Sequence, residues 1–84
     1  MNNQSKSHYF YVGLKYHDDA TKLDKTLTFS HPFTFEKVNT SAFEEIVKES
    51  KNRISLTDPA GIPLEIHILS VSYLGHMTKD EFES

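Results

Sequence analysis

Eighty-four residues without a cysteine predict one small domain whose fold depends on its hydrophobic core, with neither disulfides nor thiolate metal sites. The net charge of −3, with a single arginine among nine basic residues, argues against a nucleic-acid partner, because phosphate contacts need a basic surface. The longest uncharged run, residues 66–78, is far shorter than the roughly 20 apolar residues of a membrane-spanning helix. We therefore expect no nucleic-acid or membrane partner.

Apart from Met1, the first seven residues are polar and have nothing to bury. We expect residues 1–7 to form a disordered tail ahead of a single domain over residues 8–84. Because this tail lacks the apolar segment of a secretory signal, we expect a cytoplasmic protein. No internal repeat, low-complexity run or linker divides the remaining sequence.

Two antiparallel strands are predicted next. Residues 8–16 alternate between apolar and more polar positions, which is typical of a strand with one buried face. Residues 17–24 are polar and turn-prone and predict a hairpin loop, and residues 25–30 predict a shorter second strand. Pro32 lacks a backbone donor and should end or bend this strand, although the alternation resumes near Thr34 as an edge strand.

Residues 41–54 have the periodicity of an amphipathic helix. Apolar residues recur at intervals of three and four positions, and the other positions are charged or polar. Ser41 and Glu44 fit a capping box, in which each side chain accepts a hydrogen bond from the backbone amide of the other residue. The apolar stripe of this helix requires a sheet face to cover it.

After the helix, residues 58–61 have the Asp-Pro-Ala-Gly order of a type I turn. The last strand, residues 64–74, is apolar at even positions up to Ile68 and at odd positions beyond it. Two explanations are open: a bulge near Ile68 shifts the register, or the second half of the strand is apolar on both faces. Residues 78–81 fit a second capping box, which predicts a one-turn helix anchored by Phe82.

Together these elements predict an α+β fold, in which a three-stranded, mainly antiparallel sheet carries one principal helix on one face and a short C-terminal helix can follow. The helix between strands two and three lets strand three lie beside strand one, in the spatial order 2-1-3. The residues predicted to form the core are Phe10, Val12, Leu14, Leu27, Phe29, Phe43, Ile46, Val47 and Ile66.

The sequence contains no motif typical of a catalytic, cofactor-binding or metal site, so we expect a protein that is not an enzyme, with no cofactor and no small-molecule substrate. Its three glycines never cluster, which excludes a glycine-rich phosphate-binding loop. The alternative is a small metal-dependent or hydrolytic enzyme, for which residue type and proximity single out two groups. These are His17, Asp18 and Asp19 in the hairpin loop, and His67 with Glu65 on the last strand.

One helix covers one face of a three-stranded sheet and leaves the other face open. The residues predicted on the open face are Tyr9, Tyr11, Leu69, Val71 and Tyr73, the last three provided that no bulge intervenes. Such a surplus of aromatic and aliphatic groups predicts a non-enzymatic protein-interaction module. The competing interpretation is that the N-terminal tail, residues 33–35 or the C-terminal turn covers this face.

We expect the partner to be a second copy, forming a homodimer, or a larger protein with a basic patch that the mildly acidic surface attracts. Edge-strand pairing is a second route to the same function, since an outer strand presents unpaired backbone groups. In size and charge the chain is similar to small acidic α+β accessory proteins of phages and plasmids, a resemblance of type that assigns no residue.

Overall fold

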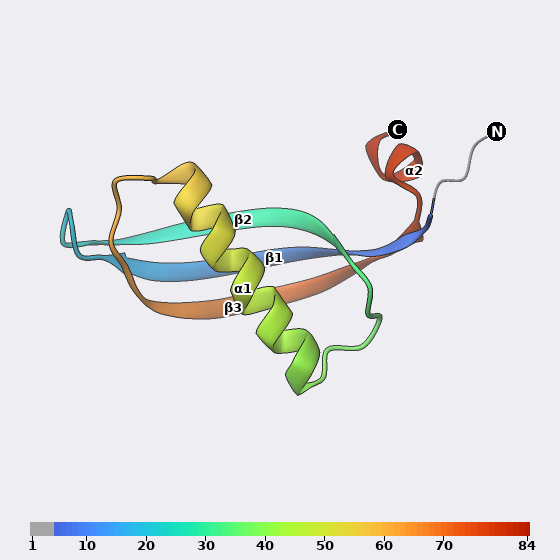
Figure 1. Ribbon diagram of the computed structural model, residues 1–84, viewed down its shortest axis with the longest axis horizontal. Coiled ribbons are helices and arrows are strands. Elements are labelled where there is room, and N and C mark those ends of the chain that lie inside the picture. The colour runs from blue at the N-terminus through green and yellow to red at the C-terminus, as the bar shows by residue number, and fades with distance from the viewer. Residues whose placement is uncertain (1–4) are drawn as a thin grey trace.

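The computed structural model describes residues 5–84, so residues 1–4 of the predicted tail lie outside the described part of the chain. The three strands form one antiparallel sheet in the order β2-β1-β3, and the long helix α1 crosses one face of it (Figure 1). The predicted α+β fold and strand order are confirmed. The elements in chain order are β1 (Ser7–Asp18), β2 (Leu23–Phe33), α1 (Thr40–Thr57), β3 (Pro63–Met77) and α2 (Lys79–Glu83).

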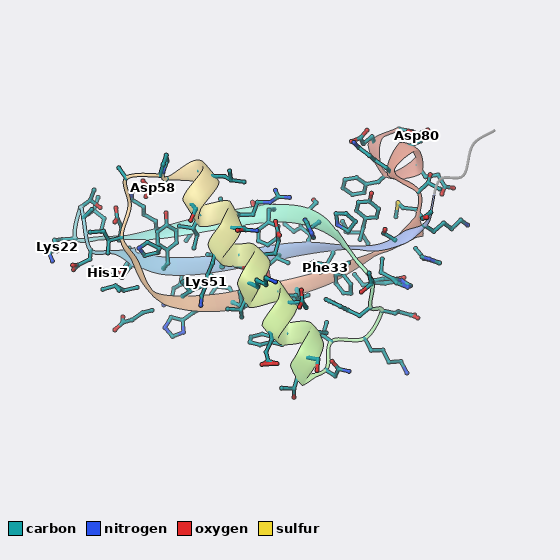
Figure 2. The ribbon with its side chains drawn as sticks, in the orientation of Figure 1. His17, Lys22, Phe33, Lys51, Asp58 and Asp80 are labelled. Atoms are coloured by element: carbon teal, nitrogen blue, oxygen red, sulfur yellow. The ribbon has the colours of Figure 1, made fainter. Side chains whose placement is uncertain are left out.

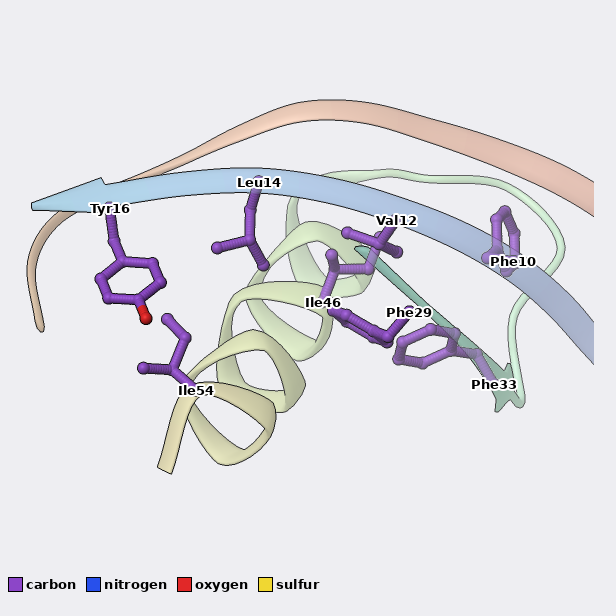
Figure 3. Packing of buried hydrophobic residues seen from close by; sticks show 8 residues of the cluster. All are labelled: Phe10, Val12, Leu14, Tyr16, Phe29, Phe33, Ile46 and Ile54. Atoms are coloured by element: carbon purple, nitrogen blue, oxygen red, sulfur yellow. The ribbon is translucent and has the colours of Figure 1, made fainter. Parts of the chain in front are cut away.

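Strand β1 lies in the centre of the sheet and pairs with both other strands. It begins inside the predicted tail, at Ser7, which pairs with Met77 of β3. Its alternation provides most of the core wall on the sheet side, as predicted, and its residues in the core are at most 5% exposed (Figure 3). These core residues are Phe10, Val12, Leu14 and Tyr16.

Strand β2 is longer than predicted and continues through Pro32. Pro32 pairs with Tyr9 of β1, and β2 is an outer strand of the sheet. A proline is tolerated on an edge strand because its missing donor need not break an inner ladder. The strand ends at Phe33, and the separate edge strand expected near Thr34 is not formed.

Helix α1 begins one residue before and ends three residues after the predicted range 41–54. Its N-cap is Asn39, which has an extended backbone (φ −94°, ψ −171°) and whose side-chain oxygen accepts a hydrogen bond from the Ala42 amide at 2.9 Å. Ser41 is therefore inside the helix, and the predicted capping box of Ser41 with Glu44 is wrong. Asparagine and serine are equally good N-caps. The sequence pattern therefore did not show whether Asn39 or Ser41 caps the helix.

Ile46 and Ile54 of α1 are fully buried against β1, but Phe43, which was expected in the core, keeps 44% of its surface exposed (Figure 3). An 18-residue helix is about 27 Å long, whereas the axes of three strands span only about 10 Å. The helix crosses the sheet diagonally, and its N-terminal turns extend beyond β3 (Figure 1). Phe43 belongs to this overhanging part. The predicted core residues that are half-buried at the periphery are Leu27, Val47 and Ile66.

A β-bulge in β3 explains the change of phase in its sequence. Leu14 pairs with Ile68 and Gly13 pairs with Ser70, so Leu69 is an extra residue without a partner on β1. The bulge predicted near Ile68 is confirmed. A Cβ atom at Gly13 would lie 2.8 Å from Ser70 Oγ, so the missing side chain allows the strands to approach closely at the bulge.

Ile46→Ala should lower the free energy of unfolding by about 2–4 kcal/mol, because it leaves a cavity between α1 and β1. Phe43→Ala should cost less than half as much, because part of its ring is already in solvent. Urea denaturation of dilute protein, followed by far-ultraviolet circular dichroism, measures both values. Equal losses for the two variants would contradict the placement of Phe43 outside the core.

Candidate functional site

The face of the sheet opposite α1, which we call the open face, is rich in hydroxyl groups rather than in apolar side chains. Near its centre Tyr11 pairs with Ser30 of β2 and with Ser72 of β3, and paired residues of neighbouring strands share a face. The next positions of the outer strands on this face are Thr28 and Ser70. Tyr11, which is 42% exposed, is thus an aromatic residue in a polar surface.

Tyr9, the second tyrosine predicted on the open face, is covered by α2. Its ring stacks on that of Phe82 with centroids 4.2 Å apart and an interplanar angle of 8°, and it is buried. The predicted capping box of this helix is confirmed, because Thr78 Oγ1 accepts from the Glu81 amide at 3.1 Å and Glu81 Oε1 accepts from the Thr78 amide at 2.8 Å. The C-terminal turn therefore covers one end of the open face.

Val71 and Tyr73 lie on the face that carries α1, not on the open face. Val71 pairs with Val12 and packs against the core, and Tyr73 pairs with Phe10, with ring centroids 5.2 Å apart. The bulge at Leu69 causes this placement, because one extra residue moves the side chains that follow it to the opposite face, here up to the next register shift at Leu74. The five residues predicted as an interface therefore do not form one continuous surface.

A different set of exposed apolar side chains belongs to the outer strand β3 and lies on both faces of the sheet. Four large apolar side chains of this strand are at least 43% exposed, and a fifth belongs to the overhanging end of α1. We call this set the β3 edge patch, and its members are Leu64, Leu69, Tyr73, Leu74 and Phe43. Two of the predicted interface residues, Leu69 and Tyr73, are thus exposed at an edge of the sheet.

The two edges of the sheet differ in their protection against pairing with another strand. On β2, Asp24 and Lys25 lie near one end and Pro32 near the other, and charges and prolines are what natural sheets place on their edges. The 15-residue strand β3 has one residue with a formal charge, Glu65. Pro63 begins this strand and three register shifts, one of them the bulge at Leu69, bend its edge, but none of these features adds a charge. Strand β3 therefore has fewer charged residues than β2, one against two.

The two groups predicted for the enzyme alternative meet at the hairpin end of the open face, where Figure 2 shows His17. His17 Nδ1 lies 2.9 Å from Asp24 Oδ1, and both residues line a hollow of about 90 Å³ together with Glu65 and His67. Substrate pockets usually measure about 300–1,000 Å³, so this hollow is too small to enclose one. Among residues 5–84, no three side chains of the metal-binding types are placed to share an ion.

Asp18, another residue of the enzyme alternative, is buried and accepts several hydrogen bonds. Its Oδ1 accepts from the amides of Ile62 at 2.9 Å and Ala20 at 3.0 Å, and its Oδ2 accepts from the Thr21 hydroxyl at 2.8 Å and lies 2.9 Å from Lys25 Nζ. These contacts, the one with the Ile62 amide most strongly, hold the pKa of Asp18 well below its usual range. Asp18 therefore fastens the β1–β2 loop to the segment between α1 and β3.

A second carboxylate, that of Asp58, extends this polar cluster to the end of α1 (Figure 2). Its Oδ2 accepts from Lys25 Nζ at 2.8 Å and from the Tyr16 hydroxyl at 3.3 Å, and its amide donates to Ile54 at the end of the helix. The two carboxylates, Asp58 first, raise the pKa of Lys25 above its usual range. The predicted turn after Asp58 is present, with the Gly61 amide donating to the Asp58 carbonyl at 3.0 Å.

A larger groove of about 380 Å³, which the sequence did not indicate, lies between the end of β2 and α1. Beside it, His31 Nδ1 lies 3.3 Å from Arg53 Nη2 and 3.5 Å from Glu49 Oε2, and Arg53 Nε donates to that carboxylate at 3.0 Å. Burial lowers the pKa of His31, and the charge of Glu49 opposes this shift. The polar atoms of these three side chains are therefore partners of one another. Within residues 5–84, no buried side-chain nitrogen or oxygen lacks a hydrogen-bond partner.

Comparison with known proteins finds no protein-family model, no curated protein and no solved structure that matches the chain. In the part of the chain that the structure describes, no helix is long and apolar enough to cross a membrane. The function proposed below rests on the geometry of the β3 edge patch.

Asp18→Asn should lower the free energy of unfolding at pH 7, because an amide cannot accept hydrogen bonds at both positions or pair with Lys25. A carboxyl whose pKa falls on folding stabilises the folded state above its unfolded pKa of about 3.9, and this contribution is lost as the pH falls toward the folded value. The stabilities of wild type and variant should therefore converge progressively below about pH 4.

Urea titrations at pH 7 and at pH 3 measure this convergence. Asp19→Asn is the matched control, because its carboxylate pairs with Lys22 on the exposed surface and should contribute little. A stability difference between wild type and Asp18→Asn that is the same at both pH values would contradict the anchoring role of the carboxylate.

Proposed function

We propose that the protein is a non-enzymatic protein-interaction module whose outer strand β3 pairs with a strand of a partner protein. The observation that carries this proposal is the composition of β3, a 15-residue edge strand with four exposed large apolar side chains and one formal charge. The unpaired backbone groups of such a strand supply hydrogen bonds to a partner, and its side chains supply specificity.

The open face supports this function less well than the β3 edge. Tyr11 is surrounded there by serine and threonine, and α2 covers Tyr9. Binding gains free energy from apolar surface at roughly 25 cal/mol per Å², so a hydroxyl-rich face offers little of it. The exposed side chains of Leu64, Leu69 and Leu74 offer more, and all three lie on β3.

Tyr73 provides the aromatic contact of the β3 edge patch. Its hydroxyl lies 2.9 Å from His8 Nδ1 and its ring lies against Phe10, so the side chain is held in place before any partner binds. A side chain that is already ordered loses less entropy on binding. Aromatic residues of this kind often carry a large share of the free energy at protein interfaces.

The partner is a protein that can present a free strand, either a second copy of the chain or a larger protein with a basic patch. The net charge of −3 favours the second kind mainly by raising the rate of association. Either kind of partner would bind this chain at the same place, the outer edge of β3.

Leu69→Lys should remove partner binding, because it places a charge on the β3 edge and a lysine on an edge strand opposes strand pairing. Leu23→Lys is the matched control, because Leu23 is 60% exposed on β2 and Leu69 is 59% exposed on β3. Co-purification of proteins with each tagged variant, after circular dichroism has shown that both are folded, measures the effect.

The expected result is loss of the wild-type partners with Leu69→Lys and their retention with Leu23→Lys. If Leu69→Lys keeps the same partners in the same amounts, β3 is not the binding edge. Loss of partners with Leu23→Lys alone would assign the function to β2 instead.

A further inference from the structure

The open face carries a block of hydroxyl groups that neither the core nor the proposed function uses. Its two central rows each take one residue from β2, β1 and β3, and we call their six positions the hydroxyl platform. One row is Ser30, Tyr11 and Ser72, and the next is Thr28, Gly13 and Ser70. None of the five hydroxyl groups has a hydrogen-bond partner among residues 5–84, so each can still donate and accept.

The platform is even, because Tyr11 is its one large side chain. Neighbouring strands lie about 4.8 Å apart and successive residues of one face about 6.7 Å apart, so the platform measures about 10 Å by 7 Å. Gly13 adds no side chain near its centre, and a Cβ atom there would lie 2.8 Å from Ser70 Oγ. The ring of Tyr11, which is 42% exposed, therefore lies beside a low area bordered by hydroxyl groups.

The platform is also uncharged, although charged residues make up 25% of the chain. Along β1, the next charged residue is Lys15, one row beyond Gly13. A surface without positive charge does not suit the phosphates of a nucleic acid, and one with little apolar area offers little free energy to a protein or a membrane. In charge and polarity the platform therefore complements a ligand that is uncharged and rich in hydroxyl groups.

We propose that the hydroxyl platform binds an uncharged polysaccharide, as an extended chain that lies across the ring of Tyr11. The C–H groups on one face of a sugar ring pack against the apolar face of an aromatic ring. The sugar hydroxyls donate to and accept from the serine and threonine hydroxyls on both sides of Tyr11. This binding does not depend on strand pairing at the β3 edge.

The shape of the platform selects one kind of chain. An even surface cannot enclose a coiled polymer, but it contacts one side of a flat ribbon along its length. Chains of β-1,4-linked glucose are such ribbons and present the faces of their sugar rings, whereas α-1,4-linked glucose chains curl into helices. The platform therefore fits the β-1,4-linked chain.

A titration of isotope-labelled protein with cellohexaose, followed by the amide chemical shifts, measures both the affinity and the position of the ligand. Because one aromatic ring and an open surface give weak binding, we expect a dissociation constant of about 0.1–1 mM. The largest shifts should lie at residues 11–13, 28–30 and 70–72. Maltohexaose, the α-1,4-linked isomer, should bind about tenfold more weakly or not at all.

Tyr11→Ala should raise the dissociation constant for cellohexaose by about tenfold or more, because it removes the stacking ring. Tyr73→Ala is the matched control, because Tyr73 is 45% exposed but lies on the face that carries α1, and it should leave the constant unchanged. Thr28→Val replaces one hydroxyl by a methyl group of similar size and should raise the constant about two- to tenfold. This variant tests the platform even if Tyr11→Ala does not fold.

Amide shifts that do not change with up to about 5 mM cellohexaose overturn the inference. Shifts that are largest in the β3 edge patch or in the hairpin loop also overturn it, as does binding that Tyr11→Ala and Thr28→Val leave unchanged. Equal binding of maltohexaose overturns the assignment to a flat chain. The co-purification experiment with Leu69→Lys tests the proposed function separately, so the failure of one does not decide the other.

Discussion

Three strands span about 10 Å between their outer axes, and an 18-residue helix about 27 Å long cannot cross them without passing an edge. The core lies where the two layers overlap, with Ile46 and Ile54 of α1 against the even-numbered residues of β1. Ten large apolar side chains within residues 5–84 are exposed, and four of them lie on β3. The same mismatch that limits the core thus produces the surface on which we base the function.

The two ends of the sheet are closed by different interactions. At the hairpin end, Asp18 and Asp58 share Lys25, and Asp18 also binds the Ile62 amide. This polar cluster joins the β1–β2 loop to the segment between α1 and β3 with few apolar groups, which suits a domain whose core is small. At the other end, α2 contributes Phe82 to a ring stack, so that end is closed by apolar contact. Neither closure uses the outer edge of β3.

Local patterns predicted the elements well, because alternation in a strand and periodicity in a helix depend on residues that are close in sequence. The exposure of Phe43 depends on where α1 leaves the sheet, which no local pattern contains. The change of phase in the sequence of β3 indicated a bulge. It did not show on which face of the sheet Tyr73 lies, because that depends on the pairing of β3 with β1. Asp18 looked like a solvated loop residue because its strongest partner, the Ile62 amide, is 44 positions away.

The start of β1 and the end of β3 lie together at one end of the sheet, where Ser7 pairs with Met77, and α2 folds back beside them (Figure 1). A mechanical force that separates the two ends of the described chain acts across the strands rather than along them. It would first open the ring stack of Tyr9 with Phe82 and then break the β1–β3 pairs one after another. A ladder loaded in this unzipping direction never has all its hydrogen bonds under tension together. The domain should therefore yield to a small pulling force.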